Sequence, residues 1–178
     1  MAKDAKSAFC EDSRVKFPTL MHLMGMGFKY VSLKGLKTKY VEAPKTEFDP
    51  LTNILTDYFI DAYCTLNPKA EKKDAEDMLV KIQKSLQNDD LGRQFYNEIL
   101  LNTGERIIDL SSPVNFYKNN TFQVATEMTC GSKDSDNYRP DITIFVNGLP
   151  LAFIEVKKEN NHKGIQLSLI HISEPTRL

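Results

Sequence analysis

The chain has 178 residues, of which 41% are hydrophobic and 10% aromatic, and this is enough for one domain with its own core. Its 23 Lys and Arg residues nearly balance its 24 Asp and Glu residues, so the net charge of −1 excludes a global field that attracts polyanions. Any contact with a nucleic acid must therefore be local.

The cysteines and the hydropathy bear on the cellular compartment. Cys10, Cys64 and Cys130 are odd in number, lie far apart and form no CxxC pair, which argues against a disulfide framework and a zinc site. No stretch reaches the eighteen or so consecutive apolar residues that a bilayer span requires. We therefore expect a cytoplasmic protein that does not contact a membrane.

Residues 1–48 show no clear periodicity, because prolines and glycines interrupt each apolar cluster. We expect a strand-poor, partly mobile lead-in to a domain that spans residues 49–166. A cluster formed by Met21, Met24, Met26 and Phe28 is either core filling, which we favour because methionine mainly fills gaps in cores, or a flexible binding surface.

Three helices are predicted next. Asp49 can cap a helix over about 51–66, in which apolar residues recur at helical spacing. An amphipathic pattern predicts a second helix over about 69–87, with a solvated charged face. A third helix over about 90–102 ends before Gly104.

After the third helix the hydrophobic period shifts toward two, which is typical of strands. The last two predicted strands are joined through Asn147-Gly148, a strong hairpin signal. The four predicted strands span about 106–110, 122–129, 141–146 and 151–157.

Three charged residues interrupt the apolar hairpin: Asp141, Glu155 and Lys157. If Val146 pairs with Pro150, Asp141 lies opposite Glu155, and all three charges share one face. The other face would then lie against the helices. It would carry Ile142, Ile144, Val146, Ala152, Ile154 and Val156.

Two neighbouring carboxylates repel each other unless a cation lies between them. Oxygen ligands without sulfur or imidazole suit Mg²⁺, with Mn²⁺ as a substitute. Lys157 could orient or deprotonate a metal-activated water or stabilise charge on a phosphate, which is the equipment for phosphodiester hydrolysis. The alternative is a surface hairpin on which Glu155 and Lys157 form a solvated ion pair.

The string RPDITIFVNGLPLAFIEVK over 139–157 closely resembles the nuclease segment of the restriction (R) subunit of type I restriction enzymes, which belong to the PD-(D/E)xK nucleases. The preceding NNTFQVATE and the following NNHKGIQ are also similar to that family. The resemblance covers about 105–166 and is weaker but compatible from about residue 50.

The resemblance implies a metal held by Asp141, Glu155 and the backbone carbonyl of Val156, with Lys157 as the catalytic lysine. It also places Gln166 at the start of a following helix, where it would assist DNA contact or coupling.

Three further residues are weaker candidates. Glu98 is either an accessory acid from the third helix or, as we favour, an exposed helix glutamate. Arg139 and Lys158 flank the motif and either contact phosphate or are simply solvated.

The last residues, 167–178, do not continue the family pattern and resemble a translated transposase end joined to a sequencing adapter. We expect the natural protein to continue past Gln166, so that the catalytic sheet is incomplete at its C-terminus. No GxxxxGK[ST] phosphate loop occurs, and ATP would therefore act only through domains absent from this chain.

Together these features predict an α+β fold, with N-terminal helices followed by a mixed sheet of the PD-(D/E)xK type. The expected activity is Mg²⁺-dependent endonucleolytic cleavage of double-stranded DNA, coupled to ATP-driven translocation in a complex with methyltransferase and specificity subunits. One alternative is a non-catalytic DNA-binding or subunit-docking module. Another is a chimeric translation without function.

Overall fold

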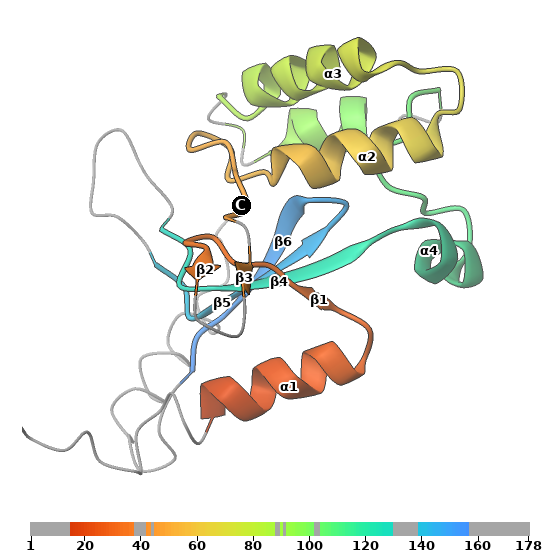
Figure 1. Ribbon diagram of the computed structural model, residues 1–178. Coiled ribbons are helices and arrows are strands. Elements are labelled where there is room, and N and C mark those ends of the chain that lie inside the picture. The colour runs from red at the N-terminus through yellow and green to blue at the C-terminus, as the bar shows by residue number, and fades with distance from the viewer. Residues whose placement is uncertain are drawn as a thin grey trace, which may run out of the picture.

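The structure, a computed structural model, contains a four-stranded mixed sheet with helices on both of its faces (Figure 1). It describes residues 15–37, 42–43, 45–87, 90, 92–101, 104–129 and 139–156. The elements, in chain order, are α1 (Phe17–Gly25), β1 (Lys29–Tyr30), β2 (Leu36–Lys37), β3 (Glu42–Ala43), α2 (Thr56–Leu66), α3 (Lys72–Ser85), η2 (Phe95–Leu100), α4 (Pro113–Asn119), β4 (Phe122–Thr126), β5 (Ile142–Val146) and β6 (Leu149–Ile154). This arrangement confirms the predicted α+β class.

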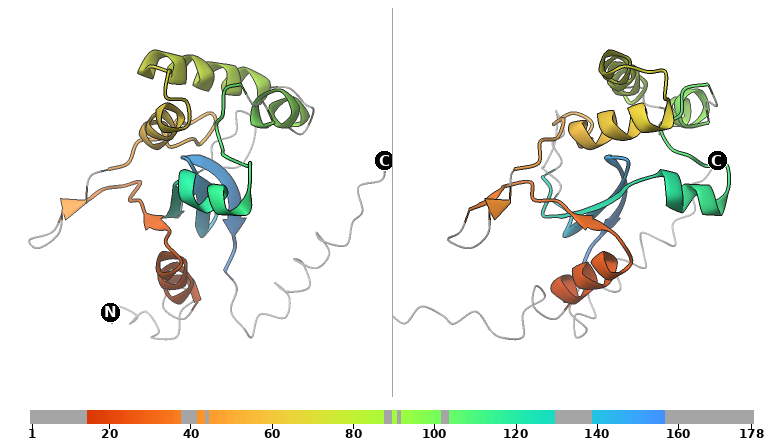
Figure 2. Two further views of the ribbon diagram at one scale, coloured as in Figure 1. Left: turned by 90° about the vertical axis from the view of Figure 1, so that its right-hand side faces the viewer. Right: turned by 45° about the vertical axis from the view of Figure 1, so that its right-hand side comes forward.

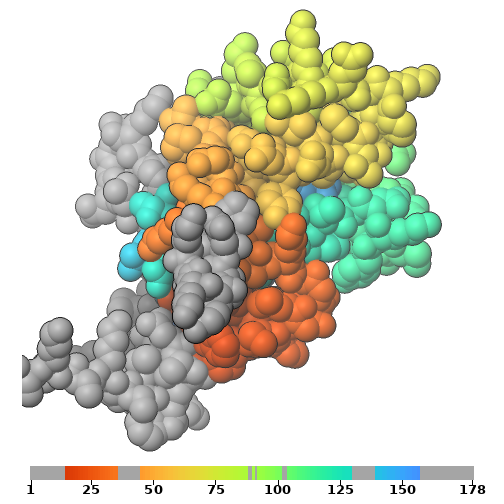
Figure 3. Space-filling view, viewed as in Figure 1, coloured from red at the N-terminus to blue at the C-terminus, as the bar shows by residue number. Residues whose placement is uncertain are grey.

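The sheet has the strand order β1-β4-β5-β6 and lies between two helical layers (Figures 1 and 2). On one face, Leu20 and Leu23 of α1 pack against Val124 and Ile142. On the other face lie α2 and α3. Figure 3 shows the side chains of α2 and α3 forming the upper part of one side of the molecule and those of α1 forming its lower part. In the described part, no helix is long and apolar enough to cross a bilayer.

The region expected to be a strand-poor lead-in contributes to the domain. Its β1 pairs in parallel with β4, and β2 pairs with β3 in an antiparallel two-stranded sheet. The preference for core filling by methionine is wrong here, because Met21, Met24 and Met26 are 50%, 41% and 65% exposed. Leucines on α1 pack against the sheet instead, and the three methionines face the solvent.

The predicted helices differ from the structure mainly at their starts. Asp49 does not cap a helix from residue 51, because its carboxylate accepts hydrogen bonds from Leu51 N (3.0 Å) and Thr52 Oγ1 (2.7 Å) within a turn. Asn53 then adopts a positive φ of 60°, so α2 begins only at Thr56. The second helix, α3, begins after a capping box formed by Glu71 and Asp74.

The third predicted helix, 90–102, is mostly a short π-helix. η2 spans Phe95–Leu100, and only residues 93–94 before it are α-helical. The wider winding is visible where Leu101 N donates to Tyr96 O at 3.1 Å, five residues back.

The predicted strand at 106–110 is wrong. Ile107 and Ile108 are only 1% and 5% exposed, as the apolar pattern suggested, but they join no strand ladder. Side-chain amides satisfy this backbone instead. Asn147 Nδ2 donates to Ile107 O at 2.9 Å, and Asp109 N donates to Asn120 Oδ1 at 2.9 Å. A buried backbone segment needs hydrogen bonds but not necessarily a sheet.

The hairpin between β5 and β6 has a two-residue turn, so the predicted pairing of Val146 with Pro150 is wrong. Val146 pairs with Leu149, across Asn147 and Gly148 with φ of 53° and 77°. A register shift between Ile144 and Phe145 then adds one residue on β6. At the end of the hairpin away from the turn, Ile142 therefore pairs with Ile154, which is the predicted register.

The predicted separation of one buried and one open face is also only partly right. Both faces of β5 are covered, since Thr143 and Phe145 are as fully buried as Ile142. Ala152 is exposed, because β6 is the edge strand of the sheet.

The Asn147-Gly148 turn is buried rather than solvated. Asn147 is fully buried, and its Oδ1 accepts a hydrogen bond from Thr121 N at 2.8 Å. Gly148 N donates to Gln123 Oε1 at 3.0 Å, and Gly148 O accepts from Leu55 N at 2.9 Å. The turn therefore anchors the hairpin to the segment that leads into α2.

Candidate active site

Asp141 and Glu155 lie at the same end of the β5–β6 hairpin. Ile142 pairs with Ile154, so Asp141 directly precedes and Glu155 directly follows the last paired residues. The Asp141 carboxylate is fixed against this end of β6, because its Oδ2 accepts a hydrogen bond from Val156 N at 2.9 Å. The Asp141 side chain is 30% exposed, and Glu155 is exposed.

A third carboxylate, Glu127, belongs to the same end of the sheet and had not been singled out from the sequence. It directly follows β4 with a positive φ of 54°. Its backbone N donates to Asp141 O at 3.1 Å, which extends the contact between β4 and β5 beyond their last pair. The left-handed conformation of a single glutamate at a strand end leaves no signal in the sequence pattern.

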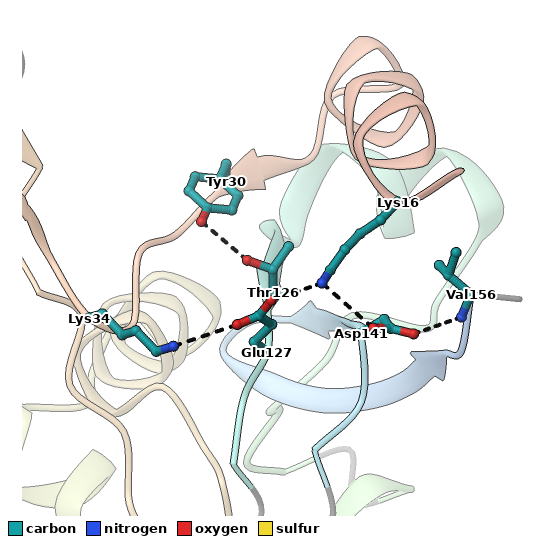
Figure 4. Close-up of polar contacts among 7 residues, drawn as sticks. All are labelled: Lys16, Tyr30, Lys34, Thr126, Glu127, Asp141 and Val156. Atoms are coloured by element: carbon teal, nitrogen blue, oxygen red, sulfur yellow. Dashed lines mark hydrogen bonds and ion pairs between the residues drawn. The ribbon is translucent and has the colours of Figure 1, made fainter. Parts of the chain in front are cut away.

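The Lys16 ammonium lies between two of these carboxylates (Figure 4). Lys16 Nζ donates to Glu127 Oε1 at 2.9 Å and is 3.6 Å from Asp141 Oδ1. Lys34 Nζ lies 3.6 Å from the other oxygen of Glu127. Lys16 precedes α1 and its side chain is only 11% exposed, whereas that of Lys34 is 75% exposed.

These contacts set the charge state of Glu127. The hydrogen bond from Lys16 and then the positive charge of Lys16 lower the pKa of Glu127 below its ordinary value. Partial burial opposes this effect, while Lys34 and Arg139 reinforce it. Glu127 is therefore ionised at neutral pH, and Lys16, Lys34, Glu127 and Asp141 form an ion-pair cluster at this end of the sheet.

Of the other predicted site residues, the structure describes Glu98 and Arg139 only. Glu98, on η2, accepts a hydrogen bond from Gln94 Nε2 at 2.9 Å and lines a groove with Lys81 of α3, apart from Asp141. Arg139 is exposed and acts on Glu127 only through its charge. Lys157, Lys158 and Gln166 lie outside the described residues, and their roles stay predictions.

The chemistry of this end of the sheet fits a hard divalent cation. Carboxylate oxygens of Asp141 and Glu127 already face a cation, the Lys16 ammonium. No three His, Cys, Asp or Glu side chains converge on one point within the described residues. Mg²⁺ and Mn²⁺ nevertheless suit a site of few carboxylates, because they keep several water ligands and also accept backbone carbonyls.

A four-stranded mixed sheet with helices on both faces and acidic side chains where neighbouring strands end is consistent with an α+β fold of the restriction-endonuclease type. In comparisons with known proteins, the family described as type I restriction enzyme R protein N terminus matches residues 9–168. The chain belongs to this family, which confirms the resemblance noted in its sequence. No curated protein and no solved structure matched the chain.

Proposed function

We propose that this chain is the nuclease domain of a type I restriction enzyme R subunit and that it hydrolyses phosphodiester bonds in double-stranded DNA with Mg²⁺. One observation carries the proposal. The Asp141 carboxylate is held by Val156 N, directly beyond Glu155, at the end of the hairpin. Family membership supports the same assignment.

In this proposal Asp141, Glu155 and the Val156 carbonyl hold the metal. When bound, Mg²⁺ would supply an activated water and charge stabilisation for the phosphate. The hydrogen bond from Val156 N fixes the orientation of the Asp141 carboxylate at this end of β6, where it would serve as a ligand. Lys157 holds or transfers a proton near the attacking water, while Arg139, Lys158 and Gln166 contact DNA.

The domain needs no sequence recognition of its own, because the specificity subunit of the complex would supply it. This division of labour agrees with the formal net charge of −1. The methyltransferase and specificity subunits are the proposed partners. Cleavage is coupled to ATP-driven translocation by other domains of the R subunit.

The test uses a full-length R subunit assembled with its methyltransferase and specificity subunits. Asp141→Asn, Glu155→Gln and Lys157→Met should each reduce cleavage of plasmid DNA by about 10²-fold or more, while ATP hydrolysis persists. Glu105→Gln is the matched control, because Glu105 pairs with Lys81 at 3.2 Å on another part of the surface. Cleavage that survives all three site substitutions would favour a docking or DNA-binding module instead.

A further inference from the structure

The most buried charge in the ion-pair cluster belongs to Lys16. Its side chain is 11% exposed, compared with 30% for Asp141, 38% for Glu127 and 75% for Lys34. A lysine side chain that is buried to this extent needs partners for its charge, and carboxylates can compensate the lost hydration. Within the described part of the chain, two carboxylates on two different strand ends lie beside Lys16.

Apolar contacts anchor α1 to the sheet in addition to this charge. The helix is held by apolar contacts of Leu20 and Leu23, together with Phe28 after its end, against Val124 and Ile142 of the sheet. The contact between Lys16 and the carboxylates is therefore additional to helix docking. Its main effect is electrostatic, and it acts on a residue proposed above as a metal ligand.

The two contacts of Lys16 are unequal. Nζ is 2.9 Å from Glu127 Oε1, a strong charge-assisted hydrogen bond, but 3.6 Å from Asp141 Oδ1. A divalent ion on Asp141 would repel the ammonium beside the same carboxylate. Lys16 can give up Asp141 without losing all compensation, because Glu127 keeps it paired within the protein.

We propose that Lys16 is the internal counter-ion of the carboxylate centre, meaning the proposed metal ligands Asp141 and Glu155, and that it sets the affinity of this centre for Mg²⁺ through Asp141. It neutralises Asp141 before the metal binds and moves wholly to Glu127 when the metal binds. Lys16 and Glu127 are thus positioning residues, not metal ligands. This inference rests on the proposed nuclease function.

The test is Mg²⁺ titration calorimetry on the 178-residue chain without DNA, repeated with Mn²⁺. Lys16→Met should bind Mg²⁺ about tenfold more tightly than wild type, because the competing cation is gone. Lys34→Met is the matched control: Lys34 Nζ lies 3.6 Å from the other oxygen of Glu127, its side chain is 75% exposed, and its loss should change the affinity less than twofold. If circular dichroism shows that Lys16→Met is unfolded, Lys16→Gln takes its place.

A double-mutant cycle tests the role of Glu127. Glu127→Gln should weaken Mg²⁺ binding when Lys16 is present, because the ammonium loses its hydrogen bond to Glu127 and then competes more strongly for Asp141. It should have little effect in the Lys16→Met background. Equal weakening in both backgrounds would make Glu127 a direct ligand and overturn the proposal.

The outcomes also separate this inference from the proposed function. The role of Lys16 alone is overturned if Asp141→Asn abolishes Mg²⁺ binding while Lys16→Met leaves the affinity unchanged or weakens it. Absence of binding in wild type, Lys16→Met and Lys16→Gln, all shown to be folded, overturns both the role of Lys16 and the metal-dependent nuclease.

Discussion

Gly148, in the turn between β5 and β6, is the position where a single added methyl group should damage the fold most. A Cβ there would lie 2.6 Å from Leu55 O and 2.9 Å from Phe59 N, both backbone atoms that cannot rotate away. The residue also has a φ of +77°, which L side chains rarely adopt. Gly148→Ala therefore combines a backbone clash with conformational strain.

The magnitude follows from these two contributions. The left-handed backbone costs roughly 1–2 kcal/mol for a residue with a Cβ. Overpacking against fixed atoms adds about 1–3 kcal/mol. Gly148→Ala should thus lower the free energy of unfolding by about 2–5 kcal/mol, a large part of the total stability of a domain.

Gly92 offers a matched control that isolates the strain. Its φ is +78°, but a Cβ there would meet nothing within 4 Å. Gly92→Ala should cost only the conformational part, roughly 1–2 kcal/mol. Urea unfolding followed by circular dichroism measures both variants. Equal destabilisation of the two would refute the claim that the turn is pressed against the start of α2.

Three further predictions concern polar side chains that hold the turn between β5 and β6 and the ends of α4 in place. Asp109 has its pKa lowered to about 2 by hydrogen bonds from Asn119 and Ser111, so the unfolded chain binds more protons below about pH 4. Stability should therefore fall between about pH 4 and about pH 2, and thermal unfolding of Asp109→Asn should lack this part of the decline. Asn147→Ala should cost about 2–5 kcal/mol in urea unfolding, because it leaves buried backbone groups without partners; a cost below about 1 kcal/mol would contradict the network. Ser112→Ala removes the cap of α4 and should cost about 1 kcal/mol, which Ser112→Asp should restore.

Local sequence patterns were sufficient to predict the helices and strands whose residues show a clear hydrophobic period. The alternating residues of β4 and β5 and the helical spacing of α2 and α3 led to elements of the right kind, with ends misplaced by a few residues. Asp141 and Glu155 were correctly aligned at the hairpin end, although the turn was assigned one residue too long. The bulge on β6 compensated for that error.

Contacts between distant segments could not be predicted in this way. Lys16 and Glu127 are 111 residues apart, and no spacing rule relates a lysine before one helix to a glutamate after a distant strand. The strand expected at Ile107 failed for a related reason. Its backbone is satisfied by the amide of Asn147, 40 residues later, so burial was predicted correctly but its structural form was not.

The parallel pairing of β1 with β4 has a consequence for synthesis of the chain. Lys29 must wait for Gln123, its partner in the sheet, which emerges from the ribosome 94 residues later. At about 5–20 residues per second this delay lasts about 5–20 s. During that time the apolar side of α1 has no sheet to cover it, whereas the β5–β6 hairpin forms from adjacent segments. The helix that follows Lys16 is synthesised before β4 and docks late, so its apolar side is exposed to aggregation while the chain is being made.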